Sequence, residues 1–298
     1  MSPSVAFRRL AGHDVRTYLT RPSGPDDLAD RIGDSKIVIN IRSTSRFTAD
    51  VLERCPALRL ISIWGTGTDN VDLAAARTKG VRVTNTPGVS AVAVAEHTIA
   101  LIMAVAKQIV QVDQEVRHGR WPQGMVTELR GKTLGLIGTG AIGREVARLG
   151  AAIGMRVIAW TFHPRGGVAE WVTFDEVFRQ SDVVSIHLRL STDTAGLIRR
   201  EHFELMKPGA ILINTARGAI VNESDLVQAL LTNRIAGAGL DVFETEPLPA
   251  ASPLSAMRNV VLTPHAAGIT PEATEAGLAL AIENAFAFLA GQPTNVVA

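Results

Sequence analysis

The chain has 298 residues, which is enough for two compact domains rather than one. Its 30 Lys plus Arg nearly balance its 29 Asp plus Glu, so it lacks the one-signed field typical of nucleic-acid or membrane-surface binding. We therefore expect a small-molecule partner, with no nucleic acid and no membrane. Cys55 is the single cysteine, and residues 1–10 lack the apolar core of a signal peptide, so we expect a cytoplasmic location.

Short, apolar, β-branched runs predict strands at 37–41, 58–63, 81–83, 134–137, 157–160, 183–187, 211–214, 238–242 and 260–262. Helical patterns between and after them predict helices at 50–54, 73–79, 91–118, 142–153, 174–179, 223–232 and 271–289. Because the strand runs show little polar alternation, we expect them to be covered on both faces. This order of elements predicts an α/β fold with parallel sheets wrapped by helices.

The domain boundary falls near the long helix that starts at residue 91. We expect a first domain over 1–92, completed by the last helix in 269–298, and a second domain over 93–268. The stretch 91–106 is mostly apolar but contains Glu96 and His97, and it is shorter than the roughly 20 residues of a membrane span. It is therefore predicted to be a buried helix.

Three glycines at dinucleotide-binding spacing, Gly138, Gly140 and Gly143, lie between a predicted strand and a predicted helix. The first glycine would allow the tight turn, the second would let a pyrophosphate approach the backbone, and the third would let helix and strand pack closely. The start of the helix would add free amides and partial positive charge. This context predicts a bound nicotinamide dinucleotide.

The strand after the glycine loop should end in an acidic residue that holds the adenosine ribose. Here Thr161 takes that place, and His163 and Arg165 follow it. The missing carboxylate would remove repulsion of a 2′-phosphate, and both basic side chains could pair with one. Alternatively, Thr161 bonds the ribose of NAD and the basic residues face water, so NAD and NADP both remain open.

Several further segments resemble the D-isomer-specific 2-hydroxyacid dehydrogenase family, which includes phosphoglycerate dehydrogenases and hydroxypyruvate or glyoxylate reductases. The matching segments are 64–72, 94–97, 134–143, 206–209, 213–218, 239–247 and 263–268. The resemblance covers nearly the whole chain. It implies two Rossmann-like domains, one flavodoxin-like and one dinucleotide-binding, with an active-site cleft between them, and dimerisation through the cofactor domain.

The resemblance assigns the catalytic arginine, glutamate and histidine to Arg217, Glu246 and His265. Their chemistry suits hydride transfer between NAD(P) and a small 2-hydroxy or 2-oxo acid. A histidine can give or take the proton on the substrate oxygen near neutral pH, and Glu246 beside it would favour the imidazolium. Arg217 would hold the substrate carboxylate and polarise its carbonyl. No residue is assigned to a metal.

The remaining family contacts divide between cofactor and substrate. The cofactor contacts carried over are Ala141, Ile142, Thr215, Ala216, Asp241 and Gly268, with Asp241 at the nicotinamide carboxamide. For the substrate, the amides of Thr66 and Gly67 would take the carboxylate, and Arg42 matches an arginine at the anionic end of phosphoglycerate, although it could also be a surface arginine. A corepressor or sensor on the same fold, with little turnover, is the alternative to an enzyme.

Overall fold

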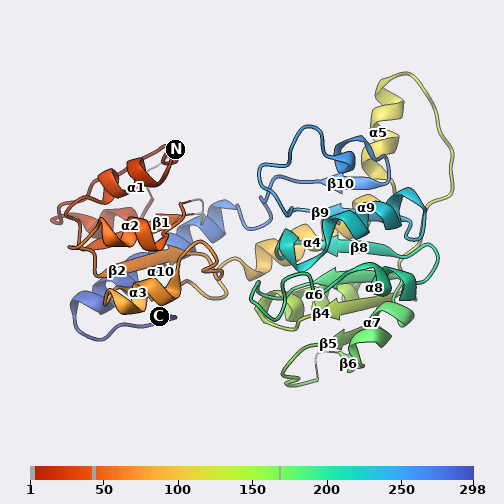
Figure 1. The fold of residues 1–298 in the computed structure, drawn as a ribbon. Helices are drawn as coiled ribbons and strands as arrows, with labels where there is room; N and C mark the ends of the chain where they lie inside the picture. The colour runs from red at the N-terminus through yellow and green to blue at the C-terminus, as the bar shows by residue number, and fades with distance from the viewer. Residues whose placement is uncertain (1–3, 42–44, 168) are drawn as a thin grey trace. The chain divides into compact units, whose positions relative to one another are not determined.

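The computed structural model describes residues 4–41, 45–167 and 169–298 (Figure 1). The chain forms two compact units. Unit 1 comprises Met1–Ser90 and Ile269–Ala298, and unit 2 is the continuous segment Ala91–Gly268. Both contain parallel sheets and helices, so the α/β fold class predicted from the sequence is confirmed.

Unit 1 is organised around three parallel strands in the order β1-β2-β3. Its elements are η1 Phe7–Leu10, α1 Pro25–Ile32, β1 Ile37–Ile41, α2 Ala49–Glu53, β2 Leu60–Trp64, α3 Leu73–Thr78, β3 Arg82–Thr84 and α10 Pro271–Leu289. Helix α10 packs along β2, where the Ser62 hydroxyl donates to the Ala281 carbonyl at 2.9 Å. A side chain at Gly277 would overlap the Trp64 ring, so a glycine is required there for this close approach.

Unit 2 contains seven parallel strands in the order β10-β9-β8-β7-β4-β5-β6. Its strands are β4 Thr133–Ile137, β5 Arg156–Trp160, β6 Glu170–Trp171, β7 Val183–Ile186, β8 Ile211–Asn214, β9 Gly237–Leu240 and β10 Val260–Leu262. The chain runs outward from β4 in one direction and then outward from β7 in the other. The order therefore reverses between β4 and β7, as in dinucleotide-binding folds, where the ligand lies at the carboxyl ends of the strands.

Helices cover both faces of this sheet (Figure 1). They are α4 Ala91–Ala106, α5 Ile109–Arg117, α6 Ala141–Ala152, α7 Phe174–Gln180, α8 Arg200–Leu205 and α9 Glu223–Leu231, with short 3₁₀ turns η2 Gly218–Ile220 and η3 Pro253–Ala256. In β8, Ile211 and Ile213 belong to the apolar cluster with α4 and α6, whereas Leu212 belongs to the cluster with α7, α8 and α9. Burial on both faces explains why the strand runs are nearly all apolar.

The single helix predicted over 91–118 is wrong. The structure has two helices, α4 and α5, bent by 59° at a break where Gln108 adopts a left-handed conformation with φ +53°. Helix α4 buries seven residues, whereas α5 buries none, so the bend ends the buried helix and directs the next one into solvent. Within the described residues, no single helix is long and apolar enough to cross a membrane, and only this bent pair reaches that length and composition together.

Candidate active site

The glycine loop joins β4 to α6, and its three glycines have different surroundings. Gly138 has φ +99°, and a Cβ there would lie 2.6 Å from the His187 carbonyl oxygen. A Cβ on Gly143 would overlap the Gly138 carbonyl, so this glycine allows the helix to start close to the strand. At Gly140, a Cβ would have no protein atom within 4 Å apart from those of the adjoining residues. Two glycines are thus needed by the fold, and the third borders open space.

The open space at Gly140 fits a dinucleotide pyrophosphate. Gly140 is the N-cap of α6 and provides no side-chain cap, and Ala141 and Ile142 begin the helix. The first amides of a helix have no partners within it and carry partial positive charge, which suits an anion. The residues present therefore fit the phosphate groups of NAD or NADP.

The segment after β5 is polar, basic and exposed. Thr161 is partly buried directly after the strand, and His163 and Arg165 are exposed beyond it. Neither basic side chain has an ion-pair partner among the described residues. The next acidic residue along the chain, Glu170, pairs with Arg156 at 2.6 Å. No carboxylate between Thr161 and Gly167 therefore opposes a 2′-phosphate.

The turn after β8 carries Thr215, Ala216 and Arg217. Asn214, which ends the strand, holds this turn from both sides: its Oδ1 accepts from the Ala216 amide and its Nδ2 donates to the Arg217 carbonyl, both at 3.0 Å. The Arg217 Nη1 donates to the Ala216 carbonyl at 2.8 Å. A side chain at Gly218 would overlap the Phe243 backbone, so this glycine lets the arginine turn lie against the segment that leads to Glu246.

Glu246 and His265 lie on different segments, and the structure brings them together. The His265 Nδ1 is 2.7 Å from Glu246 Oε2, while Glu246 Oε1 accepts from the Phe243 amide at 3.1 Å. Because the carboxylate can only accept when ionised, Nδ1 carries the proton of this bond. The other ring nitrogen, Nε2, is then the one left to exchange a proton with a substrate, and the His265 side chain is 46% exposed.

The electrostatic balance at Glu246 favours its ionised form. Burial opposes the carboxylate charge, but the hydrogen bond and charge of His265, the Phe243 amide and the charge of Arg217 outweigh it, so the pKa of Glu246 is lowered. Arg217 is therefore near enough for its charge to act on the Glu246 carboxylate.

Asp241 follows β9 and is 1% exposed. Its Oδ1 accepts from the Thr263 hydroxyl at 2.6 Å and the Ala266 amide at 2.9 Å, and its Oδ2 accepts from the Ala267 amide at 2.9 Å. A carboxylate has about four acceptor positions, so about one remains for a further donor. The sequence had placed Asp241 only at the cofactor and had missed its bonds to the turn that carries His265.

In unit 1, Thr66 and Gly67 lie in the turn after β2. The Thr66 carbonyl accepts from the Asn85 side chain at 2.8 Å, and the preceding Gly65 amide donates to the Thr86 hydroxyl at 2.7 Å. The Thr66 and Gly67 amides make no hydrogen bond within the described residues. Arg42 lies outside the described residues. Gly268, the last residue of unit 2, is partly buried.

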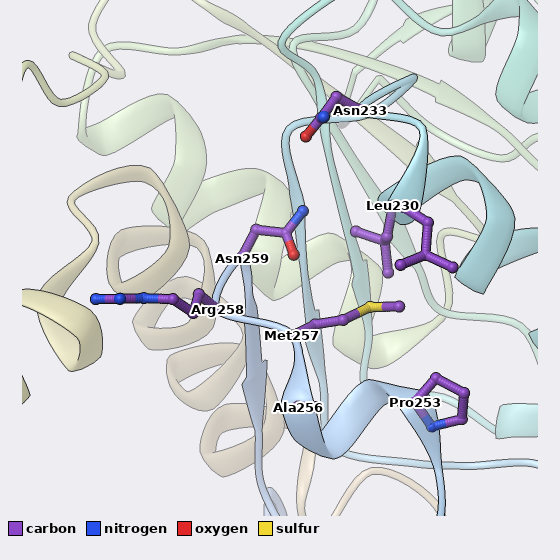
Figure 2. A pocket seen from close by; sticks show the side chains of 8 residues that line it. Leu230, Asn233, Pro253, Ala256, Met257, Arg258 and Asn259 are labelled. Atoms are coloured by element: carbon purple, nitrogen blue, oxygen red, sulfur yellow. The ribbon is translucent and has the colours of Figure 1, made fainter.

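A separate surface hollow lies near the amino ends of β9 and β10, whereas the site residues follow the carboxyl ends of the strands. It measures about 470 Å³ and lies between the end of α9, at Leu230, and residues 253–259, which precede β10. Figure 2 shows Met257 extending toward Leu230, with Arg258 pointing away. The site residues Thr215, Asp241 and His265 follow the carboxyl ends of their strands, so this hollow is not part of the site.

The described residues contain no group of three or more potential metal ligands.

A doubly wound parallel sheet, a glycine loop with open space over it, and a His–Glu pair with an arginine together define a nicotinamide-dependent oxidoreductase. The model of the NAD binding domain of D-isomer specific 2-hydroxyacid dehydrogenases matches residues 99–267. The chain belongs to this family. It is an enzyme that transfers hydride between NAD or NADP and a small 2-hydroxy or 2-oxo acid.

Known proteins similar to the chain carry names of this enzyme class or of related reductases. A glyoxylate reductase from Aeropyrum pernix is 45% identical over 272 residues, which are 85% of this chain and 80% of the relative. The solved structure of an acyclic imino acid reductase with NADPH and D-Arg is 32% identical, with a TM-score of 0.92 and 99% and 96% of the two chains covered. A D-lactate dehydrogenase from Aquifex aeolicus, complexed with NAD and lactic acid, is 31% identical, with a TM-score of 0.84 and 90% and 88% covered.

Proposed function

We propose that the chain reduces glyoxylate or hydroxypyruvate, with Arg217, Glu246 and His265 as its catalytic residues. The 2.7 Å contact between His265 Nδ1 and Glu246 Oε2 is the observation that carries this proposal. Bound NADH or NADPH supplies the hydride. Arg217 holds the substrate carboxylate and polarises the 2-oxo group, and His265 Nε2 donates the proton to the oxygen. Glu246 keeps the imidazole oriented and stabilises its protonated form.

The other assigned residues complete the proposal. The glycine loop (138–143), Thr215, Ala216, Asp241 and Gly268 are proposed to hold the cofactor, and the Thr66 and Gly67 amides are proposed for the substrate carboxylate. Arg42 is proposed for a second anionic group on the substrate. None of the similar proteins described above is a corepressor, and no feature of the site favours that alternative.

The test follows the loss of NADH or NADPH absorbance with a panel of 2-oxo acids. We expect turnover of glyoxylate or hydroxypyruvate. His265→Gln should lower kcat by about 10² to 10⁴-fold because the proton donor is lost, and Arg217→Ala should raise KM as well as lower kcat. Arg179→Ala, which changes an exposed arginine on α7, is the control and should keep wild-type rates. Binding of cofactor without turnover of any 2-oxo acid would contradict the proposal.

We further propose that Arg165 favours NADPH over NADH. The proposal is supported by its lack of an ion-pair partner within the described residues and by the absence of an acid after β5. Arg165→Ala should weaken NADPH binding by about tenfold, the effect of one charge-assisted phosphate contact, and leave NADH binding unchanged. Fluorescence titration of both cofactors measures this. Equal NADPH affinity in wild type and variant would remove Arg165 from the phosphate site.

We also propose a homodimer that forms through the exposed segment 109–126. Helix α5 buries no residue, and the loop after it carries Trp121 at 77% and Met125 at 96% exposure. Figure 1 shows α5 and this loop projecting from the unit 2 sheet. Trp121→Glu should shift the mass measured by light scattering from dimer to monomer. A wild-type monomer would refute the proposal.

The expected cytoplasmic location is likewise proposed, and cell fractionation tests it.

A further inference from the structure

The catalytic histidine lies in a turn with an uncommon backbone conformation. His265 has φ +51°, a left-handed value that residues with a side chain adopt rarely and only when their surroundings hold it. Its amide donates to the Asp241 carbonyl at 2.7 Å, and the next two amides, of Ala266 and Ala267, donate to the Asp241 carboxylate. Asp241 therefore holds three consecutive amides of this turn, beginning with that of His265.

The Asp241 carboxylate is held by a second group outside the turn's amides. The Thr263 hydroxyl donates to Asp241 Oδ1 at 2.6 Å and lies 3.0 Å from His97 Nε2, on helix α4. Because the hydroxyl has one hydrogen and gives it to Asp241, His97 Nε2 must be the donor of the second bond. The result is a directed chain of hydrogen bonds from His97 through Thr263 to the Asp241 carboxylate, which also accepts from the Ala266 and Ala267 amides of the turn.

We propose that Thr263, supported by His97, is a positioning residue that sets the orientation of His265. Neither residue contacts Glu246 or Arg217 in the described hydrogen bonds, so both act through Asp241. This inference rests on the proposed function, in which His265 Nε2 gives the proton to the substrate.

The physical argument concerns the freedom of the buried carboxylate. With Thr263 in place, Oδ1 has two donors and cannot rotate without losing both. Without the hydroxyl, the carboxylate can turn toward other donors, which weakens its bond to the Ala266 amide. The turn can then relax toward common backbone angles and carry the imidazole away from Glu246. A misplacement of about 1 Å is enough to slow a proton transfer on the order of 100-fold.

The experiment compares full-length variants in the glyoxylate or hydroxypyruvate assay. Thr263→Val removes the hydroxyl at nearly constant volume, and Thr263→Ser restores it. Thr84→Val is the matched control, because its buried hydroxyl has no hydrogen-bond partner within the described residues. His265→Gln reports on the proposed function itself. The readouts are kcat, KM for the acid, Kd for the cofactor and the melting temperature.

We expect Thr263→Val to lower kcat, measured at saturating cofactor, by about 10 to 100-fold, with KM for the acid within about threefold of wild type. Because Asp241 is also a proposed cofactor contact, the cofactor Kd should rise as well. Thr263→Ser and Thr84→Val should keep kcat within about threefold. His97→Phe should lower kcat several-fold, and an unchanged kcat would remove His97 from the network.

Two outcomes would overturn the role of Thr263. In one, Thr263→Val keeps its kcat while His265→Gln is inactive. In the other, Thr263→Ser is as slow as Thr263→Val, so that side-chain shape rather than the hydroxyl matters. If His265→Gln itself retains wild-type kcat, the proposed function fails and the positioning role fails with it.

Discussion

At the scale of single residues, the fold requires Gly138 and Gly143 of the glycine loop, whereas Gly140 borders the space proposed for the cofactor. Gly140→Ala places a methyl group in open space at φ −64°, so the free energy of unfolding should change by less than about 1 kcal/mol. The same methyl would meet an approaching pyrophosphate, and the Kd for NADH should rise at least about tenfold. Gly143→Ala should instead destabilise the fold by about 1 to 3 kcal/mol through overlap with Gly138.

Urea unfolding and cofactor fluorescence measure these two effects separately. Gly24→Ala is the control, because it adds a methyl group in open space at the N-cap of α1, away from the loop. A Gly140→Ala protein with wild-type cofactor affinity would show that the backbone at Gly140 does not approach the pyrophosphate.

A second residue-scale prediction concerns His187, which follows β7 beside the glycine loop. Burial lowers its pKa to about 3, and its Nδ1 is buried without a partner within the described residues. Between about pH 6.5 and 3 the unfolded chain therefore binds a proton that the folded chain does not. Stability from this residue is fully present above about pH 6.5 and is lost progressively as the pH falls toward 3.

His187→Gln, which does not titrate, should remove this dependence. Between pH 7 and pH 5 the wild type should lose up to about 2 kcal/mol more than the variant. Urea unfolding at the two pH values measures the difference. Equal losses in the two proteins would show that the imidazole is protonated in the folded state.

At the scale of elements, the break between α4 and α5 contains one residue with a left-handed backbone conformation. Gln108 adopts φ +53° and ψ +35°, where a side chain costs about 1 kcal/mol relative to glycine. Gln108→Gly should therefore raise the melting temperature by a few degrees. Gln114→Gly, inside α5, is the matched control and should lower it, because glycine is unfavourable within a helix. A destabilised Gln108→Gly protein would mean that the glutamine side chain contributes more than its strained backbone costs.

At the scale of the whole molecule, the two units draw on separate cores. The apolar clusters of unit 2 contain only residues from 91–268, whereas the unit 1 cluster includes Val83 together with Val297 and Ala298. The fragment 91–268 should therefore unfold cooperatively and bind NADH within about threefold of the full chain. The fragment 1–90 should remain unfolded, because it lacks α10 over β2. Circular dichroism and fluorescence titration test both fragments, and a folded 1–90 fragment would contradict this division.

The sequence predicted the regular elements of the sheet well because their signals are local. All nine predicted strands are present, since a buried parallel strand must be apolar along its length. Helices α1 and α8 were not predicted, because α1 is strongly polar and α8 has only six residues. The break at Gln108 was missed because neither glycine nor proline marks it.

The candidate site was less predictable than the fold. The open side of Gly140 follows from glycine spacing, but the meeting of Glu246 and His265 depends on two turns 19 residues apart, and only the family resemblance implied it. Asn214 and Thr263 were not identified as residues that shape the site. Each is a polar residue at the end of an apolar strand, and that pattern was the available signal.

The discontinuity of unit 1 has a consequence for synthesis on the ribosome. Strands β1 to β3 emerge first, but about 180 residues of unit 2 must be translated before α10 appears. At 5 to 20 residues per second, this delay is about 10 to 40 seconds. Unit 2 can complete its core meanwhile, so the part of the chain made first is the last to fold. During that interval, the exposed apolar strand β2 is the segment most in need of a chaperone.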